Sequence, residues 1–129
     1  MGRNIVYSQI SFDVTRKCNL NCDFCTKGEP QNMTITKAIV DKTFKELKDS
    51  HVLILRLFGG EPFLSEDMIV YILKQAIKKL SFYNLAIDTN GTIYSSKVAD
   101  AIKRVCIHLS DNVKYPPLAE STSIKVGNQ

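Results

Sequence analysis

Apolar and polar residues follow two different periods along this chain, and the two periods alternate. Around residues 10–14 every second residue is apolar, which is typical of a β-strand with one buried face. Residues 52–58 are almost entirely apolar, as expected of a parallel strand covered on both faces. Apolar runs at about 85–89 and 105–109 predict a third and a fourth strand.

Between these segments apolar residues recur at intervals of three and four, the period of an amphipathic helix. The first helix follows Thr34 or Thr36, either of which can act as N-cap. The second follows Ser65 and has acidic residues in its first turn and lysines in its last, as the helix dipole favours. A third helix is predicted at about 96–103. The expected buried positions of the first two are Ile39, Val40, Thr43, Phe44, Leu47, Ile69, Ile72, Leu73, Ala76, Ile77 and Leu80.

Strands that alternate with helices indicate βαβ units, right-handed crossovers and a parallel sheet. A complete eight-unit barrel takes about 250 residues, so a chain of 129 residues has room for about four units. We therefore predict an α/β fold, a truncated partial (β/α) barrel with parallel strands and about four βα units, over residues 1–111. In residues 112–129 the periodicity is lost, which predicts a loop or a poorly ordered tail.

Composition narrows the classes of function. A hydrophobic content of 44% and a charged content of 23% are ordinary for a soluble domain. Since no apolar run approaches the ~20 residues needed to span a bilayer, we expect no membrane partner. The net charge of +4 comes from lysines on helix faces rather than from a basic run, which makes nucleic-acid binding unlikely. Free cysteines fit a reducing cytoplasm, the expected location.

Three cysteines, Cys18, Cys22 and Cys25, lie on one short segment with the sequence C-N-L-N-C-D-F-C. Three thiolates can bind three irons of a cubane cluster and leave the fourth iron open, whereas a cluster that only carries electrons normally has four protein ligands. A structural zinc site is the alternative, but it needs a fourth ligand. The candidates are isolated residues outside any second C-x-x-C or H-x-x-x-H motif, namely His51, Cys106 and His108.

Two further motifs end predicted strands. Gly59-Gly60-Glu61-Pro62 follows the second strand, and Thr89-Asn90-Gly91 follows the third. Together with T-R-K-C-N-L-N-C-D-F-C at residues 15–25, they resemble the radical S-adenosylmethionine (SAM) superfamily, and most closely its peptide-modifying and cofactor-maturing (SPASM-type) branch. All three motifs are predicted at the carboxyl ends of strands, where barrel-type α/β folds place their active sites.

The resemblance implies a [4Fe-4S] cluster ligated by the three cysteines, with SAM chelated to the open iron. Reduction by an electron donor such as flavodoxin or ferredoxin would cleave SAM to a 5′-deoxyadenosyl radical, which abstracts hydrogen from a C–H bond. The substrate would be a peptide or a cofactor precursor. From the residues themselves, a non-catalytic zinc or iron–sulfur structural or interaction module stays the alternative.

The resemblance also assigns cofactor-binding residues. Glu61 would supply negative charge near the amino group of SAM, beside glycines that allow a close backbone approach. On the residues alone, the glycines and Pro62 fit a tight strand-to-helix turn, and Thr89 and Asn90 fit a strand-terminating turn. Ser110, with Asp111 as the alternative, would contact the ribose from the end of the fourth strand. The implied cofactor-binding set is Phe24, Gly59, Gly60, Glu61, Pro62, Thr89, Asn90 and Ser110.

The superfamily's core is a partial barrel of six units, more than this chain can hold. We therefore expect the N-terminal part of a radical SAM enzyme, or a compact enzyme that a further subunit or a second copy completes. Cys106 lies among apolar neighbours in the predicted fourth strand, and we expect it to be buried by packing.

Overall fold

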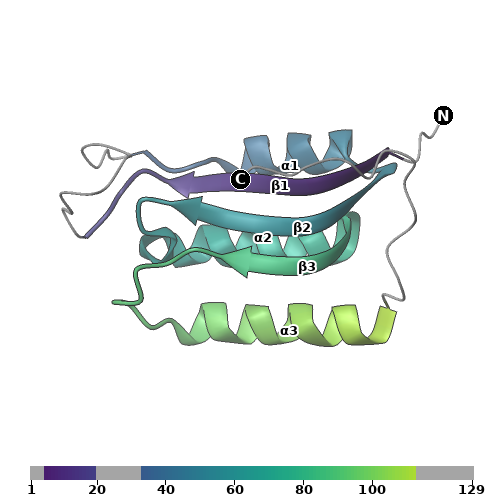
Figure 1. The fold of residues 1–129 in the computed structure, drawn as a ribbon. Coiled ribbons are helices and arrows are strands. Elements are labelled where there is room, and N and C mark those ends of the chain that lie inside the picture. The colour runs from purple at the N-terminus through teal and green to yellow at the C-terminus, as the bar shows by residue number, and fades with distance from the viewer. Residues whose placement is uncertain (1–4, 20–32, 113–129) are drawn as a thin grey trace.

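The computed structural model describes residues 5–19 and 33–112. Strands and helices alternate along them (Figure 1). Their order is β1 (Ile5–Thr15), α1 (Lys37–Glu46), β2 (Ser50–Gly59), the short 3₁₀ turn η1 (Pro62–Ser65), α2 (Glu66–Lys79), β3 (Ser81–Ile87) and α3 (Ser96–Asn112). None of the helices in these residues is long and apolar enough to cross a membrane.

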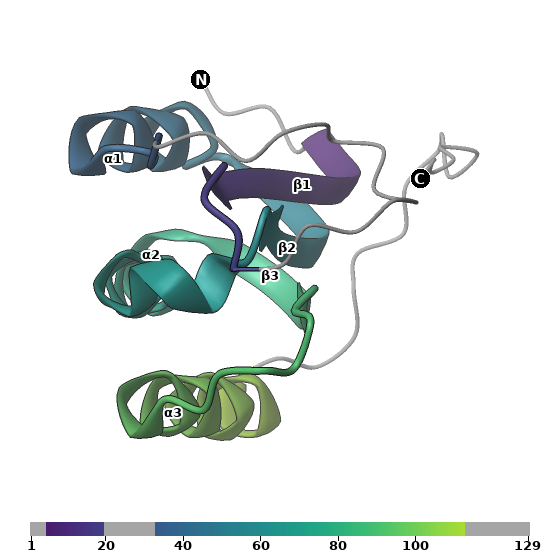
Figure 2. The ribbon, with the colours of Figure 1, turned by 90° about the vertical axis from the view of Figure 1, so that its left-hand side faces the viewer.

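The three strands form one parallel sheet in the order β1-β2-β3. Figure 2 shows all three helices on the same side of this sheet. The prediction of an α/β fold with parallel strands is thus confirmed, and the arrangement is consistent with part of a (β/α) barrel. No described helix covers the opposite face of the sheet.

The core lies between the sheet and the helices. Phe12 on β1 pairs in register with Leu57 on β2, and its ring meets Phe44 of α1 edge to face at a centroid distance of 5.6 Å. The predicted stripe of α2 is buried at four positions, Ile69, Ile72, Leu73 and Ala76. From α3 the core receives Val98, Ala101 and Val105.

A hydroxyl residue stands at the N-terminus of each helix. Thr36 is the N-cap of α1, where its hydroxyl accepts a hydrogen bond from the Ile39 amide at 3.3 Å. Ser65 occupies the N-cap position of α2 as predicted, but its side chain makes no capping hydrogen bond. Ser95 accepts from the Val98 amide at 3.2 Å at the start of α3. Hydroxyl caps therefore fix the starts of α1 and α3.

The predicted fourth strand is wrong, because residues 105–109 belong to α3. Val98, Ala101 and Val105 are buried at helical spacing, and no Gly or Pro interrupts residues 96–112. The apolar run at residues 105–109 resembles a strand only when it is considered without the helical period of the residues before it. The described residues therefore contain three βα units.

Two single-residue predictions of burial are wrong, and β2 begins before the apolar run that predicts it. Cys106, expected to be buried, is exposed on α3. Ile39, expected in the core, is 52% exposed because α1 covers the sheet with Val40 and Phe44 instead. His51 is the second residue of β2, and its ring is hydrogen-bonded to the Ser81 hydroxyl at 2.9 Å.

The two readings of residues 105–109 differ in a measurable way. On a strand Val105 and Ile107 would share one face, whereas on α3 Val105 is fully buried and Ile107 is 52% exposed. Val105→Ala should lower the free energy of unfolding by about 2 kcal/mol through lost burial and a residual cavity. Ile107→Ala should change it by less than ~0.5 kcal/mol. Urea unfolding of both variants checks this, and equal losses would contradict the helix.

Candidate functional site

The three motifs meet at one edge of the molecule. Since β1, β2 and β3 are parallel, their carboxyl ends and the turns that follow them lie side by side (Figure 1). Cys18 follows β1, Gly60 follows β2, and Asn90 follows β3. The structure therefore brings together the described start of the segment that carries the cysteines (the cysteine segment) and the two turns that the sequence singled out. We call this part of the molecule, formed by residues 15–19, 59–62 and 89–92, the motif edge.

The base of the cysteine segment is closed by hydrogen bonds to the residues that follow it. The Arg16 amide donates to the Met33 carbonyl at 2.8 Å, and the Ile35 amide donates to the Val14 carbonyl at 2.8 Å. Thr15, only 1% exposed, donates its hydroxyl to the Met33 carbonyl at 2.8 Å. Both ends of the segment that carries the cysteines are thus fixed to each other beside β1.

Gly59 and Gly60 fix the other side of this base. The Gly60 amide donates to the Thr15 carbonyl at 2.8 Å, and the Glu61 amide donates to the Lys17 carbonyl at 2.7 Å. A Cβ atom on Gly60 would lie 2.2 Å from the Lys17 carbonyl oxygen, and one on Gly59 would lie 2.3 Å from that of Thr15. The close backbone approach that these glycines allow is therefore to their own chain, just before Cys18.

Glu61 is fully buried, and its carboxylate accepts three hydrogen bonds from the protein. One oxygen accepts from the Phe63 amide at 2.9 Å and from the Thr89 hydroxyl at 2.8 Å. The other accepts from the Asn90 amide at 2.7 Å. This side chain joins the end of β2 to the turn after β3.

The turn after β3 also reaches the cysteine segment. The Asn90 side-chain amide donates to the Asn19 side-chain carbonyl at 2.9 Å. The Asn19 amide donates in turn to the Thr92 hydroxyl at 2.8 Å. Sequence reasoning assigned no role to Asn19, although it lies within the cysteine motif, or to Thr92, which directly follows the Thr89-Asn90-Gly91 motif.

Cys18 is the one predicted cluster ligand within the described residues. Its thiol is partly exposed, is not in a disulfide, and lies next to the hydrogen-bonded Asn19. Cys22, Cys25 and Phe24 lie outside the described residues. A soft thiolate at the open edge of a sheet, on a segment whose base is fixed on two sides, fits an iron–sulfur cluster.

The candidate fourth ligands of a zinc site lie away from Cys18. His51 is the second residue of β2 and lies eight residues before Gly59, which corresponds to about 26 Å along the strand. His108 stacks on Phe82 near the start of β3 at a centroid distance of 6.1 Å, and Cys106 is two residues earlier on α3. Within residues 5–19 and 33–112 no group of three or more potential ligands could hold a metal ion.

Some of the remaining predicted site residues lie at the motif edge, and others lie at the far end of α3. Pro62 is buried at the start of η1, and Thr89 and Asn90 lie at the motif edge. Ser110 is exposed near the end of α3, two residues beyond His108. Since His108 packs at the amino end of β3, Ser110 and Asp111 lie away from the motif edge, and the strand end on which their assignment depended is absent.

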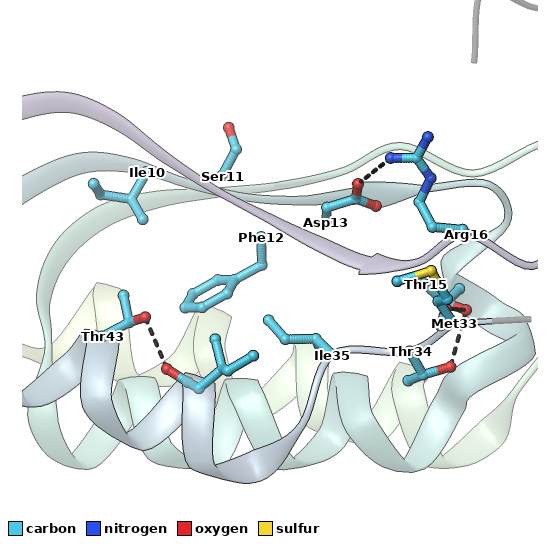
Figure 3. Close-up of a pocket in the computed structure, with 11 residues that line it drawn as sticks. Ile10, Ser11, Phe12, Asp13, Thr15, Arg16, Met33, Thr34, Ile35 and Thr43 are labelled. Atoms are coloured by element: carbon cyan, nitrogen blue, oxygen red, sulfur yellow. Dashed lines mark hydrogen bonds and ion pairs between the residues drawn. The ribbon is translucent and has the colours of Figure 1, made fainter. Parts of the chain in front are cut away.

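A pocket of about 540 Å³ lies between the outer edge of β1 and α1 (Figure 3). Ile10 and Phe12 of β1 face Ile35, Ile39 and Thr43 across it. At its upper end, near the base of the cysteine segment, the Arg16 guanidinium donates to Asp13 at 3.1 Å. None of the predicted metal- or cofactor-binding residues lines this pocket, although it reaches Thr15 and Arg16 at the base of the cysteine segment.

The sheet face without a described helix carries a polar cluster. The Arg56 guanidinium donates to both carboxylate oxygens of Asp88, at 3.1 and 3.2 Å, and to the side-chain carbonyl of Gln9 at 3.3 Å. Arg56 lies on β2, Gln9 lies on β1, and Asp88 directly follows β3. Arg56 therefore connects all three strands on the face that the interior of a closed barrel would contain.

Comparison with known proteins gives the same superfamily that the three motifs resemble. The family model described as "Radical SAM superfamily" matches residues 12–116. "GTP 3',8-cyclase" of Aliarcobacter butzleri is 33% identical over 137 residues, covering 99% of this chain and 40% of that protein. The enzyme of the same name from Clostridium perfringens is 32% identical, with 95% and 40% covered. "Molybdenum cofactor biosynthesis protein 1" of Drosophila melanogaster is 33% identical, with 71% and 17% covered.

The chain spans at most about two fifths of the length of these curated relatives. The SPASM-type branch stays a prediction.

Gly60 and Gly91 form a matched pair for testing the base of the cysteine segment. Gly60→Ala should lower the free energy of unfolding by about 3 kcal/mol, because its Cβ would meet the backbone carbonyl of Lys17. Gly91→Ala, at φ +78° with nothing within 4 Å of its Cβ, should lose only about 1 kcal/mol through backbone strain. Urea unfolding measures both, and equal losses would rule out the steric reason.

Glu61→Gln tests the link between the two turns. The amide group that replaces one oxygen must face either the Phe63 amide or the Asn90 amide, so a buried donor loses its acceptor. We expect a loss of about 2 kcal/mol in the free energy of unfolding. Glu46→Gln, at an exposed position of α1, is the control and should leave the urea midpoint unchanged. A tolerated Glu61→Gln would show that the carboxylate does not hold the turn.

Proposed function

The chain belongs to the radical SAM superfamily, and on that premise we propose that it forms the N-terminal part of the catalytic core of an enzyme that matures a cofactor precursor. Members of this superfamily use a [4Fe-4S] cluster and SAM. The observation that carries the proposal is the convergence of three motifs at one sheet edge, where each is hydrogen-bonded to the next.

When bound, the cluster and SAM supply a one-electron cleavage of the SAM sulfur–carbon bond, giving methionine and the 5′-deoxyadenosyl radical that takes a hydrogen atom from substrate. We propose that Cys18, Cys22 and Cys25 ligate the cluster. The fixed base around Thr15 supports this assignment, because it holds the start of the cysteine segment in one place. The chain's part is to bind and orient the cofactors, since the difficult chemistry belongs to them.

Glu61 acts through the turn rather than by direct contact with SAM. Both carboxylate oxygens already accept from protein donors, and the side chain is fully buried. The backbone around Gly60 and Pro62, with Thr89 and Asn90, then forms the surface offered to SAM.

The proposed substrate class is a purine nucleotide such as the GTP in the names of the relatives, rather than a peptide. A nucleotide carries phosphates, which need cationic partners. Arg56 supports this choice, because its side chain is 35% exposed on the uncovered face and already binds a carboxylate in bidentate fashion. A phosphate would replace Asp88 as its partner.

The reaction also requires an electron donor, for which a flavodoxin or ferredoxin is the natural class. A reducing cytoplasm is the proposed location, since the ligand thiols must stay reduced. The residues that surround the substrate would come from further chain or from a second subunit, because the relatives are more than twice as long.

Iron binding tests the ligand assignment. After anaerobic reconstitution with iron and sulfide, Cys18→Ala should lose most of its iron, because two thiolates do not hold a cubane. Cys106→Ala, on the exposed face of α3, should keep the iron content of the parent and is the matched control. Equal iron in the parent and in Cys18→Ala would refute the assignment.

The same preparations test the reaction. Reduction with dithionite in the presence of SAM should give 5′-deoxyadenosine with the parent and not with Cys18→Ala. Added GTP should raise the yield, whereas a peptide mixture should not. A cluster that forms and never cleaves SAM would favour a non-catalytic iron–sulfur module, and zinc bound in place of iron would overturn the proposal.

A further inference from the structure

Three side chains form a closed ring of hydrogen bonds beside Cys18. Asn90 donates its amide to the Asn19 carbonyl at 2.9 Å, and Asn19 donates its amide to the Thr92 hydroxyl at 2.8 Å. Thr92 completes the ring by donating its hydroxyl to the Asn90 carbonyl at 2.7 Å. Each member donates once to the next, so the ring is satisfied without a water molecule.

The turn after β3 does not need this ring to keep its shape. The Thr92 backbone amide donates to the Asn90 side-chain carbonyl at 3.0 Å, and the Gly91 amide donates to the Thr89 hydroxyl at 3.1 Å. Glu61 holds the same turn from its buried side. Of the two bonds made by the Thr92 hydroxyl, the one that it accepts therefore links this turn to Asn19, the residue directly after Cys18.

We propose that Thr92 is a positioning residue that, through Asn19, restrains Cys18 at the sheet edge. The backbone bonds around Thr15 and Lys17 fix the segment before Cys18, and the ring fixes the residue after it. Cys18 is thereby held from both sides before any metal binds. The consequence for cluster binding rests on the proposed function, but the restraint on the thiol does not.

Thr92 is suited to a clean test because it is exposed and its hydroxyl can be removed without changing its shape. Thr92→Val removes two of the three ring bonds and keeps the backbone bond to Asn90. Thr92→Ser keeps the hydroxyl and should restore the ring. Asn19→Asp removes the donor from the other side, so its effect should not add to that of Thr92→Val.

The direct readout is the alkylation of Cys18 by iodoacetamide in the cluster-free chain. In a background with Cys22→Ala and Cys25→Ala, the two remaining thiols are Cys18 and Cys106, and exposed Cys106 is the internal reference. Thr92→Val should raise the ratio of the Cys18 rate to the Cys106 rate about fivefold, the factor expected when one net hydrogen bond is lost. Thr92→Ser should keep the parent ratio.

An unchanged ratio in Thr92→Val would overturn the proposal, as would an equal rise in Thr92→Ser. A rise that only follows a lower urea midpoint would reduce Thr92 to a residue of general stability and would overturn it as well. In the reconstituted chain with all cysteines present, Thr92→Val should also lose iron to a chelator faster than Thr92→Ser. If the parent assembles no cluster, the proposed function fails, while the alkylation ratio still tests the ring.

Discussion

The buried carboxylate of Glu61 is the constraint on which the rest of the motif edge depends. A carboxylate removed from water is costly unless hydrogen bonds replace its hydration, and Glu61 has three of them. Two of the three donors come from Thr89 and Asn90 on the neighbouring strand end. Any other conformation of that turn would leave buried charge unpaired, so the turn after β3 has one low-energy position relative to β2.

Glu61 fixes the position of the cysteine segment through two sets of hydrogen bonds. Its own backbone amide and that of Gly60 bind the chain just before Cys18. Its side chain fixes Asn90, which binds the residue just after Cys18. A single residue of the second motif thus relates the first motif to the third, and the two glycines allow the close backbone contact with Thr15 and Lys17 that this arrangement requires.

Sequence patterns were sufficient for the parts of this chain that depend on local periodicity. Neighbouring residues define the period of the buried stripe of α2 and of the first three strands. They also narrow the N-cap of α1 to Thr34 or Thr36, of which the structure has Thr36. The prediction of a strand at residues 105–109 is wrong because a short apolar run fits both the strand period and the helix period. Only the contacts of α3 with its neighbours decide between the two.

The site itself was predictable in its location but not in its bonds. Parallel strands place three motif turns together, which the order of elements already implies. Which donors Glu61 would accept from depends on the register of β2 with β3, and no motif encodes that register. Thr92 and Asn19 meet across 73 positions of sequence, where local patterns carry no information. The bonds described between the three motifs join residues 15–19, 60–61 and 89–92, which follow the carboxyl ends of three neighbouring strands. Holding the start of the cysteine segment is thus a task that these three βα units perform through bonds between their own strand ends.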